Sequence, residues 1–239
     1  MIRAGIKAQQ WRRGLREGRL PTGYKFVIAD DHPLFRGALK QALAGMAEDI
    51  EILEAGDFDI TKSIVAGNED LDLVLLDLTM PGASGLSGLI ALRGIHHSVP
   101  MVVVSAHDDP VTIRRALELG ASGFISKSAS MEEIRGAIET VLGGGVVSPG
   151  NVELGAERDP EVSDLIRRLL SLTPQQTRVL GMLAEGLLNK QIAYELNVSE
   201  ATIKAHVSAI LQKLGVDSRT QAVITLARIG GDPLQAPPH

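Results

Sequence analysis

A short apolar run, Leu73–Leu76, ends on the carboxylate of Asp77, and the turn signal Pro81-Gly82 follows at once. Apolar residues without polar alternation are typical of a strand that is buried on both faces, as in a parallel sheet. Asp77 then lies where the strand leaves the sheet, at the edge where open α/β sheets bind ligands. An isolated aspartate at such a place is more often a turn residue, so the rest of the chain decides its role.

The same pattern recurs along the first half of the chain. Strand-length apolar runs occur at 26–29, 50–53, 73–76, 101–104 and 123–125, and segments of helical periodicity alternate with them at 33–46, 60–66, 86–95, 111–119 and 131–142. Alternating strands and helices of these lengths predict an α/β fold with a doubly wound, five-stranded parallel sheet.

Polar residues stand at the carboxyl ends of the predicted strands: Asp30-Asp31, Asp77, Ser105 and Lys127. Because the carboxyl ends of parallel strands meet at one edge, we expect these side chains to converge. Neighbouring carboxylates repel one another unless a cation lies between them, and oxygen ligands suit Mg²⁺ or Mn²⁺. A lysine and a hydroxyl opposite them can bind phosphoryl oxygens. The set predicts phosphoryl transfer to a carboxylate.

This ordered set, within residues 25–142, resembles the receiver domain of two-component response regulators, which has a flavodoxin-like fold. The resemblance implies that a sensor histidine kinase phosphorylates Asp77. The implied ligands of a Mg²⁺ ion are Asp30, Asp31, Asp77 and the main-chain carbonyl of Thr79. The implied phosphate-binding and switch residues are Ser105, Phe124 and Lys127.

Two enzyme interpretations fail on spacing. Phosphatases of the haloacid dehalogenase type also use an aspartate at a strand end, but they need a second aspartate two residues later, where this chain has Thr79. Gly82, Gly85 and Gly88 do not have the G-x-G-x-x-G spacing of a dinucleotide site. We therefore expect that the protein is not an enzyme. His32, beside the aspartate pair, is interpreted as a residue at a helix start rather than as a metal ligand.

The composition excludes other classes. There are no cysteines, so disulfides, thiolate zinc sites and cysteine nucleophiles are ruled out. No apolar run reaches the roughly 18 residues that span a bilayer, and residues 1–23 lack the apolar core of a secretory signal. We expect a soluble, cytoplasmic protein with no membrane contact.

The charges are unevenly spread along the chain. Residues 1–23 carry six Lys/Arg against one Glu, residues 24–150 carry nine Lys/Arg against eighteen Asp/Glu, and residues 171–228 carry six against four. This distribution indicates a cation or basic partner for the acidic part and a polyanion for the C-terminal part. Gly14 and Pro21 interrupt the first segment, so we interpret it as a flexible basic extension.

A Gly- and Pro-rich linker spans 144–171, and its end has the periodicity of a helix from about residue 161. Thr173, Pro174 and Gln176 then give a helix start with a capping box.

Two more helices are predicted after this one. Asn189 can cap the first and Ser199 the second, and Asn197 between them tolerates the left-handed conformation of a tight turn. Helices joined in this way predict a helix-turn-helix in an all-α domain. The second helix has one apolar stripe, and its opposite face is small and polar: Thr202, Lys204, Ala205, Ser208 and Gln212. Such a face is either solvated or enters a DNA major groove, and spacing alone does not distinguish the two.

Residues 172–228 resemble the LuxR-type DNA-binding domain, through Asn189-Lys-Gln-Ile-Ala193 and Thr202-Ile-Lys-Ala-His-Val207. Together with a receiver, this is the arrangement of the NarL/FixJ class. The resemblance implies that the final helix, 219–229, is a dimer contact. The implied base contacts are Lys204, Ala205 and Ser208. The implied phosphate contacts are Lys190, Thr202, His206 and Lys213.

We therefore expect a flexible extension over 1–23, a receiver domain over 24–143, a linker over 144–171, a LuxR-type domain over 172–229 and a flexible tail over 230–239. The predicted function is a DNA-binding transcriptional regulator that is switched by phosphorylation of Asp77. It would bind double-stranded promoter half-sites as a homodimer and act on RNA polymerase. The alternative is a constitutive DNA-binding regulator whose receiver-like domain serves only dimerisation.

Overall fold

The computed structural model describes residues 8–14, 22–82, 85–150 and 159–230. Most of the predicted C-terminal tail and part of the linker lie outside these residues. The chain forms two compact units, which are treated separately below: Met1–Ala83 with Ser98–Leu154, and Ser84–His97 with Gly155–His239. Helix α4 (Ser87–Ile95) follows the third strand in the sequence but belongs to the second unit.

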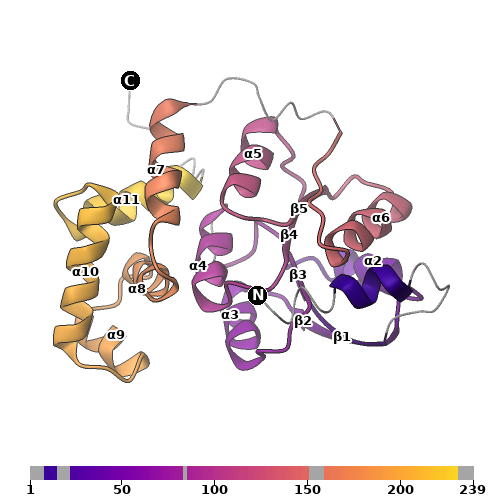
Figure 1. The fold of residues 1–239 in the computed structure, drawn as a ribbon, viewed down its shortest axis with the longest axis horizontal. Helices are drawn as coiled ribbons and strands as arrows, with labels where there is room; N and C mark the ends of the chain where they lie inside the picture. Colours follow the sequence, from indigo (N-terminus) through magenta and orange to yellow (C-terminus); the bar gives the residue numbers. More distant parts are fainter. Residues whose placement is uncertain (1–7, 15–21, 83–84, 151–158, 231–239) are drawn as a thin grey trace. The chain divides into compact units, whose positions relative to one another are not determined.

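The first unit is built on one parallel sheet with the strand order β2-β1-β3-β4-β5 (Figure 1). The strands are β1 (Thr22–Ala29), β2 (Glu48–Ala55), β3 (Leu73–Leu76), β4 (Met101–Ser105) and β5 (Gly123–Ser126). All pairings are parallel, with Val27 opposite both Leu53 of β2 and Val74 of β3. The predicted doubly wound, five-stranded parallel sheet is confirmed. The strand order reverses between β1 and β3, which is where such folds place their ligands.

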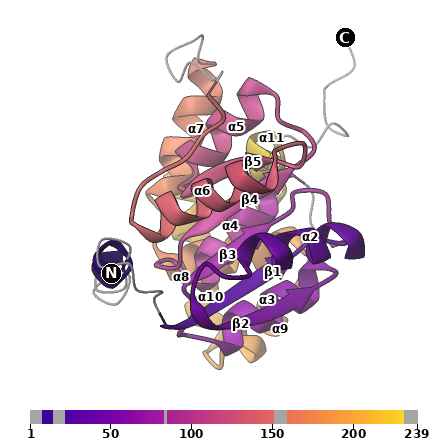
Figure 2. The same cartoon turned by 90° about the vertical axis from the view of Figure 1, so that its right-hand side faces the viewer.

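Helices cover both faces of this sheet. Helices α2 (Pro33–Leu43) and α6 (Met131–Leu142) lie on one face, and α3 (Phe58–Gly67) and α5 (Pro110–Glu118) lie on the other (Figure 1). Figure 2 shows α2 and α6 in front of the strands. On this side, Phe26 and Ile28 of β1 pack in one buried cluster with Leu39 of α2 and Ile138 of α6. Their burial is the main favourable term that holds the helices to the sheet.

The segment before β1 differs from the expected flexible extension. Residues 8–14 are helical, and Trp11 is fully buried in the α2/α6 core. Its ring meets that of Tyr24 edge-on at 5.2 Å, and Nε of Arg12 donates to the carbonyl of Gly143. Burying a large aromatic side chain is favourable and contributes to the order of this short segment. Gly14 therefore lies within a helical segment rather than preventing one.

The first residues of the predicted linker extend the sheet. The N–H of Phe124 donates to the carbonyl of Val147 at 3.0 Å, and the N–H of Val147 donates to the carbonyl of Ser122 at 3.2 Å. Val147 thereby forms an isolated parallel bridge with Gly123 of β5. The chain leaves the first unit only after it has paired with the edge strand.

The second unit is helical. Besides α4 it contains α7 (Pro160–Leu170), α8 (Pro174–Ala184), α9 (Asn189–Glu195), α10 (Glu200–Leu214) and α11 (Arg219–Gly230). The predicted linker helix corresponds to α7, and Arg168 near its end donates to the carbonyl of Leu214 at the end of α10. Among the described residues, none of the helices combines the length and the apolar character that a membrane span requires.

The helix starts of this unit match the sequence signals, with one correction. The hydroxyl of Thr173 accepts from the N–H of Gln176, whose side chain accepts from the N–H of Thr173, as the predicted capping box requires. Asn197 adopts the left-handed conformation with φ of 52°. Asn189 is not the cap of α9, because the helix already begins there and Leu188 occupies the cap position. The side chain of Gln191 accepts from the N–H of Leu188 instead.

Candidate functional site

The predicted polar residues converge at the carboxyl edge, the end of the sheet where the strands terminate. Asp30 directly follows β1, Asp77 follows β3 and Lys127 follows β5. Hydrogen bonds between strands fix these positions: the N–H of Asp77 donates to the carbonyl of Ala29, and that of Lys127 donates to the carbonyl of Ser105, both at 2.8 Å. The side chains of Asp30 and Asp77 are almost wholly buried, with 1% exposure each. Two buried carboxylates at one place require compensating positive charge.

Lys127 supplies that charge. Its Nζ lies 2.7 Å from Oδ2 of Asp30 and 2.8 Å from Oδ2 of Asp77. Burial lowers the pKa of Lys127, but hydrogen bonds to Asp30 and Asp77 and the attraction of both charges outweigh it, so the pKa lies above the ordinary lysine value. Lys127 therefore bridges the first and third strands as a fully charged ammonium.

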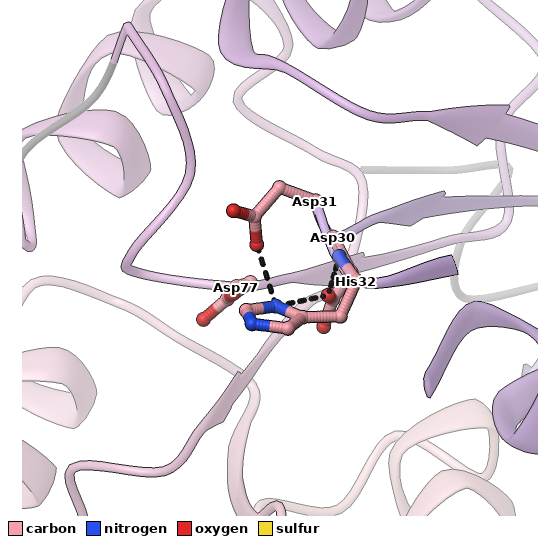
Figure 3. Close-up of side chains that lie close together, drawn as sticks. All are labelled: Asp30, Asp31, His32 and Asp77. Atoms are coloured by element: carbon pink, nitrogen blue, oxygen red, sulfur yellow. Dashed lines mark hydrogen bonds and ion pairs between the residues drawn. The ribbon is translucent and has the colours of Figure 1, made fainter. Parts of the chain in front are cut away.

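Asp31 and His32 complete the polar cluster (Figure 3). Nδ1 of His32 lies 2.6 Å from Oδ1 of Asp31 and 3.3 Å from Oδ1 of Asp30. His32 is the N-cap residue of α2, and its N–H donates to Oδ1 of Asp30 at 2.8 Å. The helix-start interpretation of His32 is thus confirmed, although its ring also faces the aspartates, which sequence spacing did not indicate.

The cluster has the donor set of a divalent-cation site. One ligand atom from each of Asp30, Asp31, His32 and Asp77 lies within 4.8 Å of all the others. Oδ2 of Asp30 and Oδ1 of Asp31 are buried, and the nitrogen beside each is Nζ of Lys127 at 2.7 Å and Nδ1 of His32 at 2.6 Å. Several carboxylate oxygens gathered this closely fit a hard cation such as Mg²⁺. Asp30, Asp31 and Asp77 are the residues that would hold it.

Thr79 and Ser105 place hydroxyl groups at the same edge. Oγ1 of Thr79 lies 3.1 Å from each carboxylate oxygen of Asp77, and the N–H of Thr79 is 3.2 Å from Oδ1. Ser105 ends β4 with no exposure, and its Oγ accepts from the N–H of His107 at 3.1 Å. That bond uses a lone pair, so the hydroxyl proton of Ser105 is still available for donation.

Two aromatic residues flank this edge. Phe124, the predicted switch residue, is 1% exposed within β5. Phe35 lies in the first turn of α2, and its ring centroid is 5.0 Å from Nζ of Lys127. Sequence reasoning missed Phe35. The signal was its position three residues after His32, which places it on the first helical turn above the sheet.

The helix-turn-helix of the second unit exposes the face that the sequence predicted. On α10, Ile203, Ile210 and Leu214 are buried. The exposed residues on the opposite face are Thr202, Lys204, Ala205, Ser208 and Gln212. Lys204 makes an exposed ion pair with Glu200 one turn earlier, at 3.0 Å. A pair of this kind contributes little to stability, so the lysine is free to exchange partners.

The predicted phosphate contacts divide into two groups. Lys190 and Thr202 are exposed, while His206 is half-buried. Nζ of Lys213 donates at 2.8 Å both to the carbonyl of Ser171 and to Oε1 of Gln176. This lysine therefore stabilises the start of α8, a role that the sequence did not indicate.

A receiver-type sheet with this carboxyl edge, followed by a helix-turn-helix unit, defines a DNA-binding response regulator. The family described as response regulator receiver domain matches residues 26–139, and the family described as bacterial regulatory proteins, luxR family, matches residues 170–226. The chain belongs to the NarL/FixJ class of response regulators, whose members are transcriptional regulators and not enzymes. This domain pair makes it a phosphorylation-regulated transcription regulator.

Curated relatives agree with this assignment. The chain is 42% identical over 212 residues to the glycerol metabolism activator of Pseudomonas putida, covering 86% of this chain and 96% of the relative. It is 35% identical to the nitrate/nitrite response regulator protein NarP of Escherichia coli, covering 85% and 94%. Among solved structures, the RcsB response regulator of Salmonella typhimurium shares the fold, with a TM-score of 0.52 at 23% identity, covering 86% of this chain and all of that one.

Proposed function

We propose that Asp77 accepts a phosphoryl group from a partner histidine kinase and that this modification controls DNA binding by the second unit. The observation that carries the proposal is Lys127, whose Nζ lies 2.7 and 2.8 Å from oxygens of two buried carboxylates at the carboxyl edge. This arrangement keeps a cation beside the oxygen that would receive the phosphoryl group. It is supported by the match of the receiver family over residues 26–139.

The chemistry follows from the side chains present. A carboxylate oxygen of Asp77 forms a bond to phosphorus while the bond between phosphorus and the kinase histidine breaks. Lys127 offsets the charge of the acyl phosphate, and the Ser105 hydroxyl donates to a phosphoryl oxygen. A Mg²⁺ or Mn²⁺ ion held by Asp30, Asp31, Asp77 and the main-chain carbonyl of Thr79 would neutralise charge that these residues leave uncompensated. The modification itself adds a charge of about −1.5 to −2.

The output of this switch is proposed to be DNA binding in the cytoplasm. The exposed face of α10 is small and polar and carries Lys204, properties that suit entry into a major groove. We propose that a homodimer binds two promoter half-sites and acts on RNA polymerase, with α11 as the dimer contact. Ile224 of α11 is 42% exposed, which leaves an apolar side chain for such a contact.

The acceptor is tested by incubating the full chain with acetyl phosphate and Mg²⁺, measuring the gain in intact mass and mapping the modified peptide. Wild-type protein should gain one phosphoryl group on the peptide that contains Asp77, and Asp77→Asn should gain none. Asp59→Asn is the matched control, because its carboxylate is 84% exposed and lies outside the cluster. Modification that persists in Asp77→Asn would overturn the assignment.

The output is tested by comparing specific DNA binding of wild-type and Asp77→Asn protein with and without acetyl phosphate. Phosphorylation should change the affinity of the wild type alone; equal affinities under all conditions would favour constitutive binding. Lys204→Ala should weaken specific binding by about 1–3 kcal/mol. Arg167→Ala, which removes an 81% exposed charge on α7, is the control and should have a smaller effect.

A further inference from the structure

Phe35 lies against the ammonium of Lys127. Its ring centroid is 5.0 Å from Nζ, within the roughly 6 Å over which a cation is attracted to an aromatic face. The ring is held in place from below, because Phe35 is partly buried and packs against the core cluster of the sheet, α2 and α6. Pro33 at the first helical position fixes the start of α2 two residues earlier. The ring is therefore a fixed surface rather than a mobile side chain.

Lys127 has three protons to donate and two carboxylate partners, Asp30 and Asp77. The Lys127 side chain is only 13% exposed, so water hydrates little of it. A cation–aromatic contact gains strength when the cation is desolvated. The Phe35 ring thus provides a third attraction for the ammonium, which unlike the other two is not a charge.

This difference matters when the charges at the carboxyl edge change. Phosphorylation converts one carboxylate partner into an acyl phosphate, and a cation at Asp30 would compete with Lys127 for the other. The lysine stem is long and flexible, so an ammonium that lost its partners would move toward solvent. The attraction of the ring is not removed by either event, because the ring is neutral.

We propose that Phe35 is a positioning residue for Lys127, whose ring keeps the ammonium next to Asp77 while the aspartates change their partners. The proposal rests on the proposed function in that it assigns Lys127 to the phosphoryl group. A purely structural Phe35 would matter to stability, but its effect would not depend on the charge at position 127.

The first experiment is a double-mutant cycle on the rate at which the full chain gains phosphoryl mass from acetyl phosphate. Phe35→Leu keeps an apolar side chain but removes the aromatic face, and it should slow the rate roughly three- to thirtyfold. Phe35→Tyr keeps the face and should remain within about twofold of wild type. In a Lys127→Met background, Phe35→Leu should have no further effect. An equal slowing in both backgrounds, or a Tyr variant as slow as the Leu variant, would overturn the proposal.

The second experiment decides the question without phosphorylation. The mobility of the Lys127 ε-methylene is measured by ¹³C relaxation in Asp30→Asn protein, in which one carboxylate partner is neutral. The methylene should stay ordered in Asp30→Asn protein, which retains Phe35, and become mobile in the Asp30→Asn/Phe35→Leu double variant. Equal mobility in these two variants would overturn the proposal. If wild-type protein gains no phosphoryl mass, the proposed function fails, while this measurement still tests the role of Phe35.

Discussion

The hydroxyl of Thr79 lies 3.1 Å from both carboxylate oxygens of Asp77, so the residue two positions after the proposed acceptor also donates to it. A donor on a carboxylate stabilises its charge and lowers its reactivity as a nucleophile. Thr79→Ala should therefore speed phosphorylation by acetyl phosphate about three- to tenfold, equivalent to one hydrogen bond of about 1 kcal/mol. Thr79→Ser keeps the hydroxyl and is the control. Intact-mass time courses measure both, and an Ala variant slower than the Ser variant would contradict the explanation.

Metal binding should depend on Asp31. Its Oδ1 is buried beside Nδ1 of His32, so Asp31→Asn would replace a charged ligand by a neutral amide. Isothermal titration with Mg²⁺ should show affinity at least about tenfold weaker than wild type. Asp59→Asn removes the same charge from an exposed ion pair with Lys62 and should leave the affinity nearly unchanged. Similar weakening in both variants would point to net charge rather than to a site, and chelation by EDTA should abolish the gain of phosphoryl mass.

Lys213 should affect folding more than DNA affinity. Lys213→Ala removes two hydrogen bonds, to Ser171 and Gln176, and should destabilise the second unit by about 1–2 kcal/mol. Thermal unfolding followed by circular dichroism measures this loss. The dependence of DNA affinity on salt should not change, whereas Lys190→Ala, at an exposed site, should reduce the salt slope by about 1. If Lys213→Ala left the stability unchanged but reduced the salt slope, Lys213 would be assigned to the DNA-binding surface instead.

Stability should fall in alkaline solution because of Tyr24. Burial, with a contribution from the charge of Asp72, raises the pKa of Tyr24 from 10.0 to about 12. The folded protein thus holds the phenolic proton more tightly than the unfolded chain, so this contribution is intact below pH 10 and is lost as the pH rises toward about 12. The loss is at most about 2–3 kcal/mol. Denaturant unfolding between pH 9 and 12 measures it, and Tyr24→Phe should be less sensitive to pH than wild type; identical profiles would exclude Tyr24 as the cause.

The sheet and its carboxyl edge could be predicted because each depends on a local pattern that recurs. The run Leu73–Leu76 matches β3 residue for residue, and parallel strands necessarily bring Asp30, Asp77 and Lys127 to one edge. The capping signals of Thr173 and Ser199 are equally local, since each acts within three residues.

What could not be predicted depends on contacts between residues distant in the sequence. Trp11 reaches the α2/α6 core, and Arg12 reaches Gly143. Neither partner is indicated by the composition of residues 1–23, which reads as a basic extension. The partners of Lys213 are similar: its hydrogen bond to the carbonyl of Ser171 joins residues 42 positions apart, which no local pattern indicates. The contact between the Phe35 ring and the ammonium of Lys127 likewise joins residues that are 92 positions apart in the sequence (127 − 35).

The burial of Trp11 also has a spectroscopic consequence. It is the sole tryptophan in the chain, and it lies in the core of the first unit. Tryptophan fluorescence excited at the long-wavelength edge of protein absorption therefore reports on that unit alone. Far-ultraviolet circular dichroism, in contrast, is dominated by the helices of both units. Comparing the two signals during one denaturation would show whether the regulator unfolds as a single cooperative body or in two steps, without any added dye.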